Sequence, residues 1–144
     1  MVDEILEAFI NAARYQPLRG GTYMPVPEKL KNKTAIINIK NGDNTCLRWA
    51  LRAHLFPARR NVDRTTSFPT NDRLNFTGID FPMPVSQIGN LERPNPGTAI
   101  NVFGWDKDEV IVHRLSEEDR NIPKINLMIM KQGNNTHYSY VKRL

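Results

Sequence analysis

The stretch that decides the fold runs from residue 41 to residue 53 and reads Asn-Gly-Asp-Asn-Thr-Cys-Leu-Arg-Trp-Ala-Leu-Arg-Ala. Its first part is rich in side chains that hydrogen-bond to nearby backbone groups, which is typical of a loop. Apolar residues then recur at helical spacing, at Cys46, Trp49, Ala50 and Ala53. We therefore expect a helix over residues 45–55 that starts close to Cys46, with Asn44 or Thr45 as its cap.

A cysteine at the start of a helix is well placed for nucleophilic chemistry. The N–H groups and the dipole of a helix N-terminus lower the pKa of a thiol, and the same N–H groups can hold an oxyanion. Cys46 is therefore the candidate nucleophile. The ordinary alternative is a small buried cysteine that packs beside Trp49.

The base for such a nucleophile is expected to come from a distant part of the chain. His137 fits, since it lies near the chain's end where a loop meets a predicted strand. His113 alternates with valines in another predicted strand, which is typical of an ordinary strand residue. His54 is about 12 Å further along the helix axis from Cys46, too far to act on it.

The remaining pattern predicts an α+β fold, with helices first and an antiparallel sheet last. We expect a helix over residues 3–14 and a short helix or turn over 28–31. Strands are predicted at residues 35–39, 99–103, 110–114, 125–130 and 137–141, with a turn at residues 106–108 that pairs the second strand with the third. Residues 57–97 hold six of the ten prolines. We expect them to form loops that carry binding contacts, with one short helix near 85–88.

Length and composition fit one domain that spans residues 1–144. The single cysteine excludes an internal disulfide and a thiolate-rich zinc site, so no metal or cofactor is expected. The start of the chain lacks a cationic signal-peptide region, and the apolar runs are too short to span a bilayer. We expect an intracellular monomer in the cytoplasm or nucleus. The net charge of +5 admits nucleic acid or an acidic protein as partner.

Two short boxes resemble known peptidase families. Residues 41–46 are similar to the Cys box of the ubiquitin-specific proteases, Asn-Leu-Gly-Asn-Thr-Cys, and residues 43–47 to the Asp-Gly-Asn-Cys-Leu box of the ovarian-tumour deubiquitinases. His137-Tyr138, followed by Tyr140, resembles the ubiquitin-specific His box, Gly-His-Tyr-x-x-Tyr. The resemblance implies a papain-like cysteine protease fold, in which a Cys-bearing helix packs on an antiparallel sheet that carries the histidine.

The resemblance also implies roles for neighbouring residues. Asn41 matches the oxyanion-hole position of the ubiquitin-specific proteases. Viral tegument-type deubiquitinases have an acid two residues before their histidine, and that position is Asn135 here, whose amide can orient an imidazole. Asp43 is the competing orienting residue, or else it shapes the oxyanion loop.

The substrate that this resemblance implies is ubiquitin or a ubiquitin-like protein, cleaved after its Gly-Gly tail. A narrow groove lined by Trp49, Trp105 and Tyr138 would admit that tail, although each aromatic residue also fits an ordinary core. Residues 18–21, Leu-Arg-Gly-Gly, have the sequence of the ubiquitin tail itself. We interpret them as a helix stop followed by a Gly turn; the alternative is a self-cleavage site or pseudosubstrate.

A wider resemblance covers most of the chain. It rests on Leu-Arg-Gly-Gly-x-Tyr at 18–23, Ala-Ile-Ile-Asn-Ile-Lys-Asn at 35–41, Cys-x-x-Trp-Ala at 46–50 and Ile-Asn-Val-Phe-Gly at 100–104. These look like a domain of Maverick/Polinton-type transposons and related viruses, found upstream of a family B DNA polymerase. The second hypothesis is therefore a non-catalytic module that binds DNA or replication proteins through helix 46–55 and Arg59-Arg60, mostly at phosphates.

Overall fold

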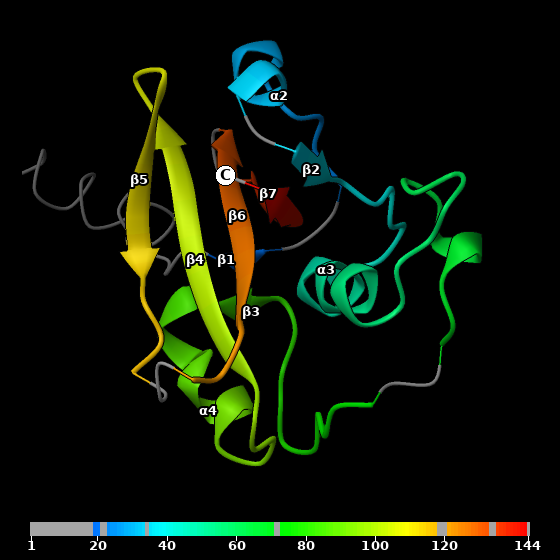
Figure 1. Ribbon diagram of the computed structural model, residues 1–144, viewed down its shortest axis with the longest axis vertical. Helices are drawn as coiled ribbons and strands as arrows, with labels where there is room; N and C mark the ends of the chain where they lie inside the picture. Colours follow the sequence, from blue (N-terminus) through cyan, green and yellow to red (C-terminus); the bar gives the residue numbers. More distant parts are fainter. Residues whose placement is uncertain are drawn as a thin grey trace, which may run out of the picture.

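The computed structural model describes residues 19–20, 23–33, 35–70, 73–117, 121–132 and 135–143 (Figure 1). The helix expected over residues 3–14 lies outside this part of the chain. The described residues are organised around one five-stranded sheet with the strand order β2-β7-β6-β4-β5. Its strands are β2 (Ala35–Ile37), β4 (Ala99–Asp106), β5 (Glu109–Arg114), β6 (Lys124–Gln132) and β7 (Asn135–Arg143).

The sheet is mixed, so the α+β class is confirmed while the expected antiparallel sheet is wrong for one pair. β4 and β6 run parallel at the centre, and the other three pairs are antiparallel. After β4 the chain turns back into β5, which pairs with one side of β4. It then reverses again into β6, which pairs with the other side of β4 and runs in the same direction as β4. Most side chains of β4 and β6 are buried on both faces, as is usual where parallel strands pair.

The turn between β4 and β5 has the conformation that a two-residue hairpin requires. Lys107 and Asp108 both have positive φ, 49° and 63°, as in a type I′ turn. The turn that the sequence predicted at residues 106–108 is therefore confirmed. Asp108 also accepts a hydrogen bond from Lys29 at 2.8 Å, which ties this exposed turn to α2 (Glu28–Lys33).

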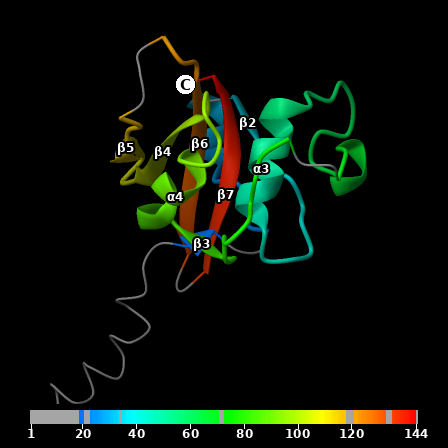
Figure 2. The same ribbon diagram turned by 90° about the horizontal axis from the view of Figure 1, so that it is seen from below.

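Helices cover both faces of the sheet (Figures 1 and 2). One face packs against α3 (Cys46–Leu55) and α4 (Gly89–Glu92), which share a hydrophobic cluster with the strands. On the other face, Leu30 of α2 packs against Met128 and Val141. α3 begins at Cys46 and ends at Leu55, in agreement with the sequence prediction, and it lies directly against β7.

Residues 57–97 contain three short elements besides α4. They are η1 (Thr65–Ser67), β3 (Met83–Pro84) and η2 (Val85–Gln87). β3 pairs with β1 (Arg19–Gly20), Arg19 opposite Pro84 and Gly20 opposite Met83. The Gly turn expected at Gly20 is therefore wrong, because Gly20 is part of a strand; Leu18 and Gly21 lie outside the described residues.

A buried ion pair holds α4 against β4 and β5. Glu92 is 6% exposed and accepts hydrogen bonds from the Arg114 guanidinium, the Ser116 hydroxyl and the Ile100 N–H. Arg114 also donates to the Ile100 carbonyl at 2.6 Å. Burial by itself raises the pKa of Glu92, but these hydrogen bonds and the Arg114 charge outweigh it and lower the pKa.

Replacing Arg114 by Ala is expected to destabilise the fold by about 3–5 kcal/mol, because Glu92 is left as an uncompensated buried carboxylate. The exposed neighbour of Glu92 serves as a matched control, and Arg93→Ala is expected to change stability by less than about 0.5 kcal/mol. Urea unfolding of the two variants measures both effects. Equal stabilities for the two variants would show that the ion pair does not hold α4 in place.

Candidate active site

The loop before α3 is organised by Asp43. One carboxylate oxygen accepts hydrogen bonds from the Thr45 N–H at 3.0 Å and the Thr45 hydroxyl at 2.8 Å. Thr45 stands at the N-cap position but makes no side-chain cap bond itself. Burial raises the pKa of Asp43, but the bonds from Thr45, Asn41 and Trp49 outweigh it and the pKa is lowered. Asp43 is thus an ionised anchor of the helix start, and its described contacts do not include the His137 imidazole.

Cys46 lies in the first turn of α3, as the sequence predicted, with its thiol against the backbone of β7. The Tyr138 N–H donates to Cys46 Sγ at 3.2 Å. The last residue pair between β2 and β7 joins Ile37 to Tyr140. Beyond that pair the thiol, rather than a strand carbonyl, is the acceptor for this N–H group. The nucleophile candidate is therefore fixed at the edge of β7.

The Cys46 thiol is protonated in this arrangement. The side chain is 1% exposed. Burial raises the pKa of the thiol to about 12, despite hydrogen bonds from the Tyr138, Leu47 and Cys46 N–H groups. The sequence-based expectation of a lowered pKa is wrong for this closed arrangement, because desolvation outweighs the helix N-terminus.

His137 is also buried, and its ring is held by residues from other segments. Its Nε2 lies 2.5 Å from Asn38 Oδ1, and the Asn38 amide nitrogen donates to the Met24 carbonyl at 2.7 Å. That second bond sets the orientation of the amide, so Oδ1 faces the ring. Since an amide oxygen only accepts, Nε2 is the protonated nitrogen and Nδ1 is the basic one in the neutral imidazole. The Tyr23 ring meets the imidazole edge-on at 5.7 Å between centroids.

Cys46 and His137 are brought to adjacent positions, but their side chains are not joined. Successive side chains of a strand point to opposite faces, and the Tyr138 side chain belongs to the cluster around Cys46. The described contacts of the His137 ring are with Asn38 and Tyr23, and the hydrogen bonds that reach the thiol come from backbone N–H groups. The His137 ring, opposite Met130, therefore lies on the α2 face of the sheet, while the thiol lies against the backbone edge of β7 beside the α3 cluster.

Neither residue proposed to orient the imidazole does so in the structure. Asn135 is exposed at the start of β7, opposite Gln132, and Asp43 is used at the start of α3. Asn38 contacts the imidazole instead. Sequence reasoning missed it because Asn38 lies in the predicted strand 35–39, outside the boxes around Cys46 and His137. Only the β2–β7 register brings it to His137, 99 residues away.

Asn41 is buried inside the same loop. Its amide donates to the Asp43 carbonyl at 2.8 Å and to the Asp43 carboxylate at 3.2 Å. In this arrangement the Asn41 side chain supports the loop rather than pointing its N–H groups at a reacting carbonyl. The N–H groups beside the sulfur are those of Tyr138, Leu47 and Cys46 itself.

The three aromatic residues expected to line a substrate groove belong to three different hydrophobic clusters. Tyr138 is buried beside Cys46 and donates its hydroxyl proton to the Met83 carbonyl. Trp49 packs with Ile39 and Phe68, and Trp105 packs on the opposite face of the sheet. They do not form one groove here, since α3, β7 and β4 carry them to separate places.

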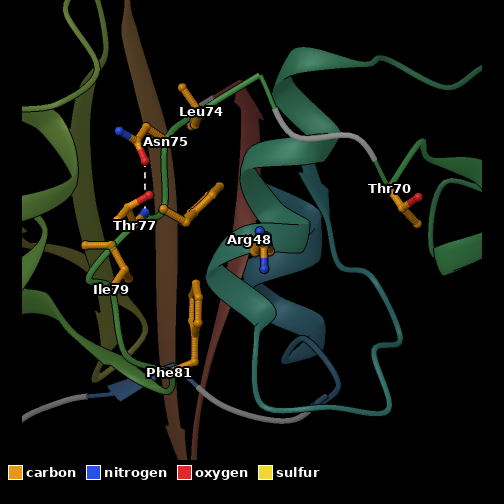
Figure 3. A pocket seen from close by; sticks show the side chains of 8 residues that line it. Arg48, Thr70, Leu74, Asn75, Thr77, Ile79 and Phe81 are labelled. Carbon is orange, nitrogen blue, oxygen red and sulfur yellow. Dashed lines mark hydrogen bonds between the residues drawn. The ribbon is translucent and has the colours of Figure 1, made fainter.

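A surface cavity of about 660 Å³ lies beside α3, between the helix and residues 74–81 (Figure 3). The Arg48 guanidinium enters it and stacks 4.5 Å from the centre of the Phe76 ring. Arg52 is buried, donates to the Thr70 carbonyl and stacks on Trp49. Both arginines of α3 thus contact the protein, while Arg48 remains partly exposed and Arg59 and Arg60 are exposed, so the second hypothesis stays a prediction.

Comparison of the chain with protein-family models, curated proteins and solved structures found no match in any of the three. In the described part of the chain, His, Cys, Asp and Glu do not gather in a group of three or more that could hold a metal ion. No helix within those residues has the length and apolar character that crossing a membrane requires. The function is therefore argued from the geometry around Cys46 and His137.

The raised thiol pKa predicts a loss of stability at high pH. The folded-state pKa of Cys46 lies above that of an unfolded cysteine, so burial of the neutral thiol stabilises below the unfolded pKa, and this is lost as pH rises toward about 12. Between about pH 8 and about pH 10, the wild type is expected to lose about 2 kcal/mol more than Cys46→Ala. Urea unfolding at both pH values measures the difference. Parallel losses in the two proteins would mean that the thiol is not desolvated.

Proposed function

We propose that the protein is a cysteine peptidase with Cys46 as nucleophile, His137 as general base and Asn38 as the residue that orients the imidazole. One observation carries the proposal. The Asn38 amide fixes the His137 ring with Nε2 protonated, on the strand whose next N–H group holds the Cys46 sulfur. A thiol at a helix start and an imidazole with an amide partner are the parts that thiol-dependent acyl transfer needs.

The reaction follows from these parts. His137 Nδ1 takes the thiol proton, and the Cys46 sulfur attacks the carbonyl carbon of the scissile amide. The negative oxygen is held by the Cys46 and Leu47 N–H groups at the start of α3. The C–N bond breaks as the imidazolium returns the proton to the leaving amine, which leaves a thioester. Water, deprotonated by the same imidazole, then hydrolyses the thioester and releases the acid and the free thiol.

Catalysis by this pair requires the closed arrangement to open. Cys46 and His137 are each 1% exposed, and the imidazole is turned toward Asn38 and Tyr23. Tyr23 is half-buried and also lines a separate cavity that Asn38 and Lys40 border. Displacement of Tyr23 therefore opens a path from that cavity to the ring. The imidazole must also pass around the edge of β7, from the α2 face of the sheet to the thiol, before Nδ1 can take the thiol proton.

The proposed substrate is ubiquitin or a ubiquitin-like protein, cleaved after its Gly-Gly tail. The support is the pair of boxes at residues 41–46 and 137–140, which resemble those of deubiquitinases. The order of the boxes, with the cysteine on a helix and the histidine on a later strand, is compatible with a papain-like peptidase.

The decisive experiment is reaction with a ubiquitin probe that carries an electrophile at its C-terminus, followed by mass spectrometry of the adduct. We expect the adduct on Cys46 and no adduct in Cys46→Ala or His137→Ala. Asn38→Ala is expected to slow labelling by about 10²-fold, because the ring loses its orientation and tautomer. The matched control is Asn135→Ala, which is expected to label like the wild type. Full labelling of Asn38→Ala would exclude its role, and an unlabelled wild type would exclude ubiquitin as substrate.

Tyr23 gives an independent test of the closed arrangement. Tyr23→Ala is expected to speed alkylation of Cys46 by iodoacetamide at neutral pH, because loss of this ring contact frees the imidazole to leave the α2 face and approach the thiol. Tyr23→Phe keeps the ring and is expected to behave as the wild type. The rates are compared after thermal melts show that both variants are folded. An alkylation rate that is the same in all three proteins would contradict the role of Tyr23 as a cover.

A further inference from the structure

β5 is the long outer edge of the five-stranded sheet (Figure 1). Its exposed apolar side chains are large, with Val110 38%, Ile111 37% and Val112 57% exposed. An edge strand has one side of its backbone unpaired within its own sheet, so it is a template for another strand. Natural edge strands are commonly protected by Lys, Pro or short length, whereas β5 is six residues long with neither Lys nor Pro.

The two faces of β5 have different surroundings. Val110 and Val112 stand opposite Trp105 and Phe103, so they continue the apolar face formed by the cluster of Phe103 and Met128 out to the edge. On the other face, Ile111 stands opposite Gly104. A side chain at Gly104 would collide with Nε2 of the His113 ring. His113 therefore lies across Gly104, next to Ile111.

The other edge of the sheet is built differently. β2 has three residues, pairs with β7 through a bulge and is followed at once by the loop that carries Asn38. That edge offers little length to a further strand. β5 is the edge that remains available for pairing in the described sheet.

The residues of β5 are complementary to themselves. Residues 109–113 read Glu-Val-Ile-Val-His, so an antiparallel copy centred on Ile111 places Glu109 opposite His113 and Val110 opposite Val112. β-branched pairs directly across two strands are stabilising, so the two Val110–Val112 pairs on either side of Ile111 favour this register.

We propose that two copies of this chain associate through β5 in this antiparallel register, which joins the two five-stranded sheets into one. The monomer expected from the sequence is then the form that prevails at low protein concentration. The β4–β5 ladder has a bulge between Val112 and Arg114, so the regular part available to a partner is short. A short ladder with a small buried area forms a weak dimer whose population depends on protein concentration.

Sedimentation equilibrium of the full chain over a range of concentrations tests the dimer. The wild type is expected to show a reversible monomer–dimer equilibrium. Val112→Glu places two carboxylates against the apolar strand pair and is expected to weaken the dimer about tenfold or more. Leu115 is similarly exposed at 60% but lies beyond the paired residues, so Leu115→Glu is the matched control and leaves the equilibrium unchanged.

The register is tested by cross-linking. Ile111→Cys places two thiols across the two-fold axis, so mild oxidation is expected to give a disulfide-linked dimer, while the native Cys46 is buried and stays reduced. Leu115→Cys, away from the axis, is the control and is expected to stay monomeric under the same oxidation. A wild type that is monomeric at every concentration overturns the proposal, as does a dimer that Val112→Glu leaves intact. A dimer lost in Val112→Glu that Ile111→Cys does not cross-link overturns the register.

Discussion

The hydrogen bond from the Tyr138 N–H group to the Cys46 sulfur is the contact on which the candidate site depends. It joins the first turn of α3 to the strand that also carries His137. The donor is a backbone N–H group, so a side-chain substitution on β7 does not remove it directly. A sulfur is a weak acceptor, so the bond positions the thiol without stabilising much by itself. The stabilisation comes from the cluster that surrounds it, where Leu47, Leu51 and Tyr138 are almost fully buried.

Burial that secures the fold opposes reactivity at the same atom. The cluster around Cys46 excludes water, and desolvation raises the pKa of the thiol to about 12. A nucleophile that works near neutral pH needs a thiolate, for which an imidazolium partner is the usual source. His137 is one residue from the strand N–H that holds the sulfur, yet its ring is kept by Asn38 and Tyr23. The chemistry proposed here therefore requires the ring and the thiol to come together from this separated arrangement.

Local patterns predicted the elements well and their assembly less well. The helical spacing from Cys46 to Ala53 placed α3 within one residue, and the polar residues 106–108 predicted the β4–β5 turn. The parallel pairing of β4 with β6 was not predictable from either strand. The sequence of an apolar strand does not determine which strand it pairs with, or whether the pair is parallel or antiparallel. Trp105 shares the face of Phe103, two residues earlier on β4, and that face is opposite α3, so the predicted aromatic groove does not form.

Asn38 shows why the candidate site was harder to predict than the fold. Sequence reasoning looked for the orienting group next to His137 or next to Cys46, where motif spacing is informative, and so considered Asn135 and Asp43. Asn135 is exposed at the start of β7 and has little to fix its side chain. Asn38 is anchored on both sides, by the end of β2 and by the Met24 carbonyl that accepts from its amide. A group that must hold an imidazole in one orientation needs that second anchor, and a backbone carbonyl from a segment 14 residues away leaves no motif in the sequence. The orienting role thus belongs to the residue whose own position is most constrained, and constraint of that kind is a property of the folded chain.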